Sequence, residues 1–289
     1  SPIDPTISGW VQQSGTVTNI EKIATPVRLS VTPYLSGYVN TYNPRISNQS
    51  TFVSTASRAG LDLKYGINDA FTLDMTLIPD FGQVLSDKQV LNLGPFEVFF
   101  AENRQFFTEG TELFNKGRLF YSRRIGGRPL HYGEINGLLG KGETIINNPE
   151  TTQLINATKV SGRTGKGTGI GAFNAVVAES FAELQNEFGV VRRVQTNPYT
   201  NYNTLVVDQN LKNNSYVTFV NTNVWRQGAD YDANVTGGFF NFKTKSQNYF
   251  VSGDAVLSQK YYPNLKDLGY TYHLTAGKGG GNWTYEAGH

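Results

Sequence analysis

The stretch RAGLDLKYGINDAFTLDMTLI, residues 58–78, decides the fold that the sequence predicts. On both sides of Asn68-Asp69, apolar residues alternate with polar residues or glycine. A period of two sends alternate side chains to opposite faces of a strand, so the pattern predicts a β-hairpin with one apolar and one polar face. Each arm has about the length of a tilted strand that crosses a bilayer, roughly 9–11 residues, and similar stretches recur along the chain. The pattern therefore favours a membrane barrel. The apolar set is Ala59, Leu61, Leu63, Tyr65, Ile67, Phe71, Leu73, Met75 and Leu77.

The composition fits a chain of strands and tight turns. Among the 289 residues are 31 Gly, 16 Tyr and 18 Phe, whereas Met occurs once and Cys is absent. Aromatic residues favour strands and glycine favours turns, so we expect an all-β fold. The mean hydropathy of −0.36 does not exclude a barrel, because lipid-facing and lumen-facing residues alternate and average out. No apolar run approaches ~18 residues, which excludes a transmembrane helix.

The charge of the chain excludes several classes of partner and site. The formal net charge is +2, from 25 basic and 23 acidic residues, and the basic residues are scattered, so we expect no nucleic-acid partner. The absence of cysteine excludes disulfides and thiolate metal sites. Ser1-Pro2-Ile3-Asp4 carries neither the basic nor the apolar region of a signal peptide, so we expect a mature chain or an excised fragment.

The pattern divides the chain into a lead-in segment and one barrel domain. Residues 1–25 are polar and irregular, and residues 26–289 carry the strand patterns. Pro33, within the first strand, favours an edge position or a local break. Residues 79–117 mix charge with bulky apolar groups without a period of two, so we expect an irregular insertion with one or two helical turns. This insertion is too apolar for a solvated loop and is a candidate plug inside the barrel.

Further hairpins are predicted after residue 154, where short turns alternate with longer segments. Membrane barrels show this asymmetry, with short periplasmic turns and longer extracellular loops. Before them we expect a short strand at residues 118–125 and mostly loop at 126–153. The predicted turns lie at residues 165–167, 212–215, 244–247 and 277–281, and the longer segments at 181–200, 226–233 and 258–269.

About 11–12 strands are visible in the pattern, and no final strand closes a barrel before His289. An open sheet edge in lipid would leave backbone groups without hydrogen bonds, at several kcal/mol each. We therefore expect either that the natural protein continues beyond residue 289 or that the sheet is soluble. The predicted fold is a partial antiparallel transmembrane β-barrel with an irregular, partly helical insertion.

Three segments carry a family resemblance. They contain GTVTNI from residue 15, LIPDFGQV from residue 77 and FFAENRQFFTEG from residue 99, and ATKVSGRT from residue 157 fits the same pattern. Their order and spacing agree with the Bacteroidota outer-membrane barrel family in which a carbohydrate-binding family-9-like module precedes the barrel, and the chain resembles that family most over residues 15–126. The amino-terminal module and the carboxy-terminal strands of the pattern are absent from this sequence, so the resemblance implies a central fragment of a larger outer-membrane protein.

The resemblance implies the cell outer membrane of a Gram-negative bacterium as the location, with outer-membrane lipid as a partner. The resemblance implies little about activity. Together with the strand pattern it favours transport or surface binding of solutes, or a subunit role in an envelope complex with partner proteins, and carbohydrate as the solute is suggested mainly by the module that this chain lacks. The alternative is a soluble all-β carbohydrate-binding protein or a glycoside hydrolase-like protein, whose apolar face would pack against a protein core. Whether Leu61, Leu63, Phe71 and Leu73 contact protein or lipid discriminates the two.

The densest group of charge beside aromatic residues is the candidate ligand or lumen site, and two interpretations stay open. The charges form a polar constriction or ligand site in the lumen, where charged side chains select solutes. Otherwise they form ion pairs that hold the 79–117 insertion on the barrel wall, because buried charges are expected to be paired and arginine binds carboxylates well. The residues are Glu97, Glu102, Arg104, Glu109, Arg123 and Arg124.

No constellation in the sequence indicates catalysis, a cofactor or a metal. Residues 162–168 lack the Gly-Lys-Ser/Thr ending of a phosphate loop and predict a hairpin turn. His131, His273 and His289 have no metal-ligand spacing, and neither a Gly-x-Ser-x-Gly motif nor a recognisable carboxylate pair is present. We therefore expect a protein that is not an enzyme. The aromatic residues near strand ends favour interface girdles, with sugar-stacking platforms as the competing interpretation.

Overall fold

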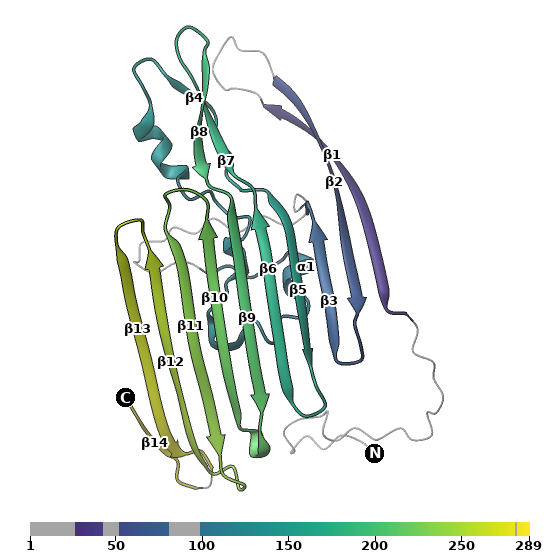
Figure 1. Cartoon of the computed structure of the whole chain (residues 1–289), viewed down its shortest axis with the longest axis vertical. Coiled ribbons are helices and arrows are strands. Elements are labelled where there is room, and N and C mark those ends of the chain that lie inside the picture. The colour runs from purple at the N-terminus through teal and green to yellow at the C-terminus, as the bar shows by residue number, and fades with distance from the viewer. Residues whose placement is uncertain (1–26, 43–51, 81–98, 281) are drawn as a thin grey trace.

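The computed structural model describes residues 27–42, 52–80, 99–280 and 282–289 and shows the expected all-β class (Figure 1). Its strands pair antiparallel and its helices are short. Eleven strands form one sheet in the order β1-β2-β3-β5-β6-β9-β10-β11-β12-β13-β14, here called the wall. They are β1 (Leu29–Tyr42), β2 (Phe52–Gly66), β3 (Phe71–Leu77), β5 (Leu154–Arg163), β6 (Thr168–Val177), β9 (Thr200–Asn210), β10 (Tyr216–Arg226), β11 (Asp232–Lys243), β12 (Tyr249–Tyr261), β13 (Lys266–Lys278) and β14 (Tyr285–Gly288).

The stretch that decides the fold forms the predicted hairpin of β2 and β3. The two strands pair antiparallel without a register shift. At the turn, the side-chain oxygen of Asn68 accepts hydrogen bonds from the backbone amides of Ala70 and Phe71, at 2.8 and 2.9 Å. An asparagine that satisfies local amides in this way stabilises a tight turn. The other side of β2 pairs with β1, so Pro33 lies in the edge strand of the described sheet, where a missing amide hydrogen is tolerated.

The other predicted hairpins also form, with β5 paired to β6, β9 to β10, β11 to β12 and β13 to β14. Two of the predicted longer segments are wrong. Strands β7 (Ser180–Gln185) and β8 (Val191–Asn197) occupy most of the first, at 181–200. Strands β12 and β13 extend into the other, at 258–269, and leave only residues 262–265 to connect them. Near the C-terminus, the connections at the two ends of the sheet therefore differ less in length than the sequence predicts.

A second, three-stranded sheet extends one end of the wall. Strand β7 pairs with β8 on one side and with β4 (Thr144–Asn147) on the other, at the upper end of the view in Figure 1. Beside it lies η4 (Tyr132–Leu138), so the segment 126–153, predicted to be mostly loop, contains two elements. A small core joins these parts, formed by Ile135, Ala182 and Leu184.

The strand predicted at 118–125 is wrong, because this segment begins at the last residue of one helical turn and contains a second. These are η2 (Lys116–Arg118) and η3 (Ser122–Arg124). Gly117 and Arg118 have φ angles of 65° and 55°, in the left-handed region, which interrupts an extended chain. The helical turns expected in the insertion are α1 (Gln105–Thr108) and η2, and residues 81–98 of the insertion lie outside the described residues.

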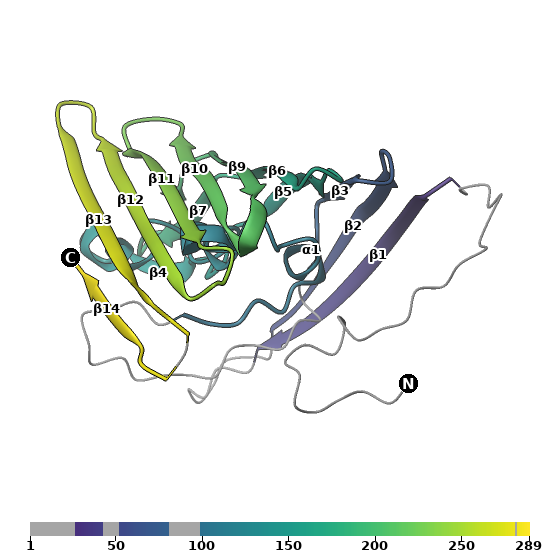
Figure 2. The same ribbon diagram turned by 90° about the horizontal axis from the view of Figure 1, so that it is seen from below.

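The wall is a curved sheet, open between β1 and β14 in the part of the chain that the structure describes. Seen end-on, its strands follow an arc, and the helical segments lie on the concave side (Figure 2). The number of wall strands agrees with the 11–12 expected, but a closed barrel is not formed by the described residues. The predicted partial barrel is therefore seen as an antiparallel arc.

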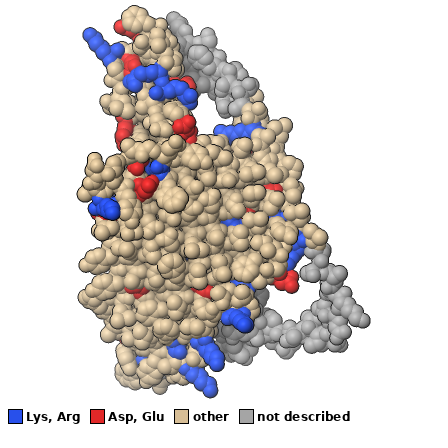
Figure 3. Space-filling view, in the orientation of Figure 1, with Lys and Arg blue, Asp and Glu red and all other residues tan. Residues whose placement is uncertain are grey.

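The two faces of the arc differ in charge. The pairing registers place all charged residues between the ends of the described wall strands on the concave face. On the convex face, the described strands carry charge only near their ends, at Asp232, Lys266 and Lys278. Figure 3, which presents the convex face, shows its middle almost bare of charge, with charged side chains gathered toward its upper and lower ends.

Burial follows the same division, because the enclosed residues of the wall, polar and apolar, lie mainly on its concave face. In β3, Asp74 and Thr76 are buried, whereas Leu73, Met75 and Leu77 are partly exposed. The main core lies on the concave side, between the wall and residues 99–126, which we call the plug. Its buried members are Phe107, Leu113, Phe114 and Ile125 from the plug and Leu154, Ala157, Phe173, Ala175, Val177, Val206 and Val220 from the wall.

Candidate functional site

The contact between plug and wall is the candidate functional site, and an aromatic cluster lies at its centre. Phe173 of β6 projects from the concave face among four rings of the plug. Aromatic pairs at such separations add about 0.5–1.5 kcal/mol each to the burial of their surface. The ring centroids of Phe106, Phe107, Phe114 and Phe120 lie 6.5, 6.1, 6.1 and 5.0 Å from that of Phe173.

A first group of charges fixes α1 to β2, β3 and β5. Lys159 of β5 is only 3% exposed, and its ammonium donates hydrogen bonds to the backbone oxygens of Phe106 and Glu109. The Glu109 carboxylate accepts a hydrogen bond of 2.7 Å from Lys64 of β2. Asp74 of β3 lies 4.0 Å from the Lys159 ammonium and 3.8 Å from that of Lys64. The hydrogen bond from Lys64 is the main reason that the pKa of Glu109 lies below its usual value, so this carboxylate is charged at neutral pH.

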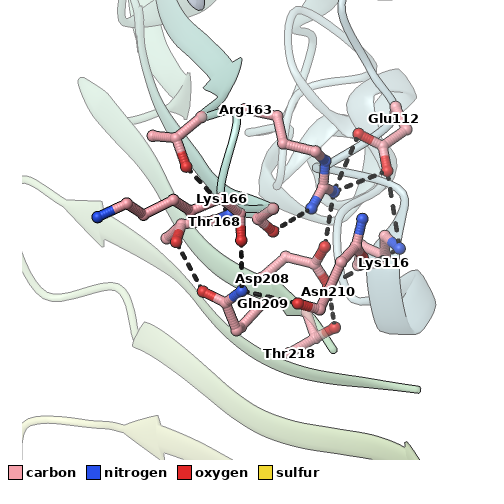
Figure 4. A network of polar contacts seen from close by, with 11 residues as sticks. Glu112, Lys116, Arg163, Lys166, Thr168, Asp208, Gln209, Asn210 and Thr218 are labelled. Carbon is pink, nitrogen blue, oxygen red and sulfur yellow. Dashed lines mark hydrogen bonds and ion pairs between the residues drawn. The ribbon is translucent and has the colours of Figure 1, made fainter. Parts of the chain in front are cut away.

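A second group of charges lies around Asp208 of β9 and is drawn in Figure 4. Asp208 is fully enclosed, and its carboxylate accepts hydrogen bonds of 2.6 Å from Arg163 and 2.5 Å from the Thr218 hydroxyl. From the plug, Lys116 lies 3.8 Å from Asp208, and Glu112 lies 3.2 Å from Arg163. The plug thus contributes a cation, Lys116, and an anion, Glu112, to this contact. The buried Asp208 therefore has cationic partners both from the wall and from the plug.

A third contact involves Asp80, which follows β3 along the chain. Its carboxylate accepts hydrogen bonds from the hydroxyls of Ser36 and Tyr38 of β1 and lies 3.7 Å from Arg58 of β2. Nearby, the Tyr34 hydroxyl donates to the backbone oxygen of residue 78 at 3.2 Å. The chain that leaves β3 is therefore held against the concave face of β1 and β2.

A fourth group stabilises the plug internally. Arg104 is buried, and its guanidinium donates two hydrogen bonds to the Glu102 carboxylate, at 2.7 and 2.8 Å. It also donates to the backbone oxygens of Ile125 and Ser122, at 2.6 and 2.8 Å. Burial alone would raise the pKa of Glu102, but the hydrogen bonds from Arg104 and from the Ser122 hydroxyl outweigh it and lower that pKa. Arg123 lies 4.0 Å from the same carboxylate.

The sequence-predicted site residues do not form one cluster. Glu102, Arg104 and Arg123 come together inside the plug, whereas Glu109 belongs to the contact with the wall. Arg124 is exposed, with its guanidinium 5.8 Å from the ring centre of Tyr121. Glu97 lies outside the described residues.

Sequence reasoning missed the partners of these residues in the wall. A signal was present, since charged residues recur at the polar positions of strands in which polar and apolar residues alternate. It did not show which strands become neighbours of the plug. The missed residues are Lys64, Asp74, Lys159, Arg163 and Asp208 in the wall and Glu112 and Lys116 in the plug.

Two ionic contacts hold the structure beyond the upper end of the wall. His131 lies between Asp230, at 2.8 Å, and Glu134, at 3.1 Å, and so joins the start of η4 to the β10–β11 turn. Burial lowers the pKa of His131, but its hydrogen bonds to the two carboxylates outweigh this effect, so that pKa is raised. Arg192 of β8 donates two hydrogen bonds to Glu143, at 2.6 and 2.7 Å. Together with the Gly140 amide, Arg192 lowers the pKa of Glu143 to about 2.

The described residues contain no group of three or more His, Asp or Glu side chains arranged to hold a metal ion. Within the same residues, no helix has both the length and the apolar character to span a membrane. What the site offers chemically is a set of paired charges and tilted, closely packed aromatic rings between two parts of one chain.

Comparison with known proteins places this arrangement in a family. A family model matches residues 25–289, which include the wall and the plug. The chain belongs to the DUF5916 family. DUF5916 is described as a domain of unknown function. No curated protein sequence matches the DUF5916 chain.

Solved structures similar to the DUF5916 chain include forms of OmpT, an outer membrane protein of Vibrio cholerae. A form that lacks loop L8 is 12% identical, with a TM-score of 0.34 over 90% of this chain and 94% of that chain. The trimer form of in-vitro folded OmpT is 13% identical, with a TM-score of 0.31 over 90% and 88% of the two chains. TM-scores of this size do not establish a shared fold.

Proposed function

We propose that this chain forms the wall and the plug of an outer-membrane β-barrel that binds or transports a solute in a Gram-negative bacterium. One observation carries the proposal: between the ends of the described strands, charge is confined to the concave face, and the convex face, which the described residues leave uncovered, carries mostly apolar side chains. A water-soluble sheet encloses its apolar face, whereas a membrane barrel exposes that face to lipid and keeps a polar interior.

The soluble alternative requires a cover for the convex face. Leu61, Leu63, Phe71 and Leu73 lie on that face and are partly exposed. In the described part of the chain, the segments outside the wall pack against its concave side or extend its upper end, and no second sheet covers these four residues. This favours hydrocarbon as their neighbour in the assembled protein.

The plug supports a role in controlled passage or binding rather than an open pore. Barrels of this kind either keep a water-filled channel or fill it with loops or a helix. Here the filling segment is held by paired charges and packed aromatic rings, so a solute that competes for these groups can loosen it. A carbohydrate as the solute, partner subunits in the envelope and the absence of catalysis remain part of the proposal, and the first of these rests on the sequence resemblance.

The test uses the absence of cysteine, which allows a single spin label at any chosen site. Labels at Leu63 and Leu205 report on the convex face, and a label at Ser258 on the concave face serves as control. In lipid vesicles, electron paramagnetic resonance measures collisions with oxygen, which concentrates in lipid, and with a water-soluble nickel chelate. We expect oxygen to dominate at Leu63 and Leu205 and the chelate to dominate at Ser258. Dominance of the chelate at both convex positions would overturn the membrane location.

A further inference from the structure

A row of side-chain amides crosses the convex face of the wall. Five strands that are neighbours in the sheet, β6, β9, β10, β11 and β12, each place one amide at the same register position. The row ends at Thr158 of β5 on one side and at Leu268 of β13 on the other. Its members are Asn174, Asn203, Asn223, Asn234 and Gln259.

Hydrogen bonds join most of the row and widen it into a patch. Asn174 donates to Asn203, and Asn203 donates to Asn223, at 2.8 and 3.1 Å. On the other side, Asn234 donates to Gln259 at 2.9 Å. Asn201, Asn221 and Thr236, each two residues along its strand from the row and on the same face, join the network through bonds of 2.8–2.9 Å, and we call all these residues together the amide patch.

The amides lie two or three residues from the upper ends of their strands, and their row differs in direction from a membrane-interface girdle. A girdle runs at constant depth around a barrel, whereas this row runs perpendicular to the strands. Five strands separated by ~4.8 Å make a row of roughly 19 Å. With a strand tilt of about 40°, such a row changes depth by roughly 12 Å, nearly half of an apolar band of ~25 Å. A row that starts at the membrane interface therefore reaches the depth of hydrocarbon at its other end.

Amides at that depth need polar neighbours. Bonds within the patch use both amide hydrogens of Asn174, Asn203 and Asn234, so the remaining capacity lies mainly in the amide oxygens, each of which can accept two hydrogen bonds, and in the amide hydrogens of Gln259. Hydrocarbon cannot satisfy that capacity, whereas another protein surface can. The patch contains no charged side chain, so its partner is a neutral surface with hydrogen-bonding groups of its own.

We propose that the amide patch is the centre of a contact between two copies of this chain, side by side in the membrane. An amide both donates and accepts, so a patch of amides is complementary to its own copy, as a two-fold contact requires. Because the amides are at hydrocarbon depth only if the convex face is in lipid, this inference rests on the proposed function.

The surface beside the patch has the relief that such a contact needs. A hollow of about 360 Å³ lies beside Asn174 and Asn203, and a second of about 270 Å³ is lined by Gly238, Ala255 and Tyr270. Tyr270 is 81% exposed. One face thus carries both a projecting ring and hollows, and a two-fold contact brings each feature of one copy against the other copy.

The test measures the oligomeric state of the protein in lipid nanodiscs by native mass spectrometry. The double variant Asn203→Leu/Asn223→Leu removes the centre of the patch and suits a lipid-facing position, so it folds if the convex face is in lipid. We expect a dimer for the unchanged protein and at least about a tenfold weaker dimer for the double variant, from the loss of several hydrogen bonds. Ser57→Leu, which makes the same kind of change on the convex face of β2, is the matched control and leaves the dimer intact.

A second measurement locates the contact. In this cysteine-free chain, Asn223→Cys introduces a single thiol at the centre of the patch. Mild oxidation joins two copies by a disulfide if the patches face each other, whereas Ser57→Cys gives no such product. A monomeric unchanged protein, or a double variant that dimerises as well as the unchanged protein, would overturn the pairing.

The Leu63 spin label separates the two proposals. A monomer with Leu63 in lipid overturns the pairing and leaves the membrane location standing. Water contact at Leu63 overturns the membrane location and, with it, the reason to pair the amides. A complex with a different protein in place of a second copy also overturns the pairing.

Discussion

Asp208 shows how much a single enclosed charge contributes to the plug–wall contact. It is fully buried, and Arg163, Thr218 and Lys116 surround its carboxylate. Removing one partner of a buried pair leaves the remaining charge uncompensated, which is more harmful than never having the pair.

We therefore predict that Asp208→Asn lowers the free energy of unfolding by about 2 kcal/mol. This is less than the ~3–5 kcal/mol of a fully enclosed pair, because Arg163 keeps partial access to water. Denaturant unfolding in detergent micelles, followed by tryptophan fluorescence, measures the loss. Asp69→Asn breaks the exposed pair with Arg28 and should cost less than about 0.5 kcal/mol. Equal losses in the two variants would contradict the role of burial.

His131 makes the contact between η4 and the β10–β11 turn dependent on pH. Its pKa in the folded protein is raised above the ~6.5 of the unfolded chain, so protonation stabilises the folded state. That stabilisation is complete below about pH 6.5 and is lost as the pH rises through the folded pKa. We predict that hydrogen exchange at residues 227–231, corrected for its intrinsic rate, is slower at pH 6 than at pH 8. His131→Gln should remove the difference, while His273→Gln should leave it unchanged.

At the scale of elements, the position of α1 depends on charges that the wall supplies. Lys64 and Glu109 lie in segments far apart in the chain and meet only when the plug packs on the concave face. The side chains of both are about half exposed, so the pair contributes at most about 1 kcal/mol, enough to shift a plug between held and loosened states.

We predict that Lys64→Glu, which repels Glu109 and Asp74, raises the frequency of open events in planar-bilayer recordings a few-fold. Adding Glu109→Lys to that variant restores the pairing between plug and wall in reverse and should return the frequency toward its original value. The control is Arg28→Gln, which breaks an exposed ion pair with Asp69 that does not touch the plug. A double variant that opens more often than the single one would rule out this contact as the restraint.

The elements differ in how well the sequence predicts them. Hairpins such as β2–β3 depend on local rules, a period of two and an asparagine turn, and these rules are visible in the residues themselves. The β7–β8 extension was missed because one of its strands, VRRVQTN, does not alternate regularly and is supported by neighbours distant in the sequence. The segment 118–125 looked extended, but left-handed backbone at Gly117 and Arg118 interrupts an extended chain, and the helical turn η3 follows.

The candidate site shows the same limit. Glu102, Arg104 and Glu109 were found because they are dense in charge and lie next to phenylalanines. Lys159 and Asp208 looked like ordinary polar positions of a strand, and only the pairing of distant strands with the plug reveals them as buried. Spatial neighbours separated by 50 residues or more leave no local signal.

At the scale of the whole molecule, the distribution of charge over the two faces of the wall indicates which face contacts lipid. The convex face is free of charge between strand ends, and lipid would penalise any charge placed there. The same change on a water-exposed strand would be almost neutral.

We predict that Leu73→Lys, on the convex face of β3, costs about 2–3 kcal/mol of stability in lipid vesicles. Thr271→Lys, on the concave face of β13 where the side chain is exposed, should cost less than about 0.5 kcal/mol. Folding titrations in vesicles of fixed composition measure both. Similar small costs for the two variants would place the convex face in water.

The ion pairs between the plug and the wall differ in their exposure to water, so external salt weakens some of them more than others. Lys64 with Glu109 and Arg163 with Glu112 are partly open to water, whereas Asp208 and the ring of Phe173 are not. Counter-ions shorten the reach of exposed charges from about 10 Å at 0.1 M salt to about 3 Å at 1 M. A rise in external salt would thus weaken the exposed ion pairs between the plug and the wall. The buried contacts of Asp208 and Phe173 would persist, so the plug would become more mobile without leaving the wall.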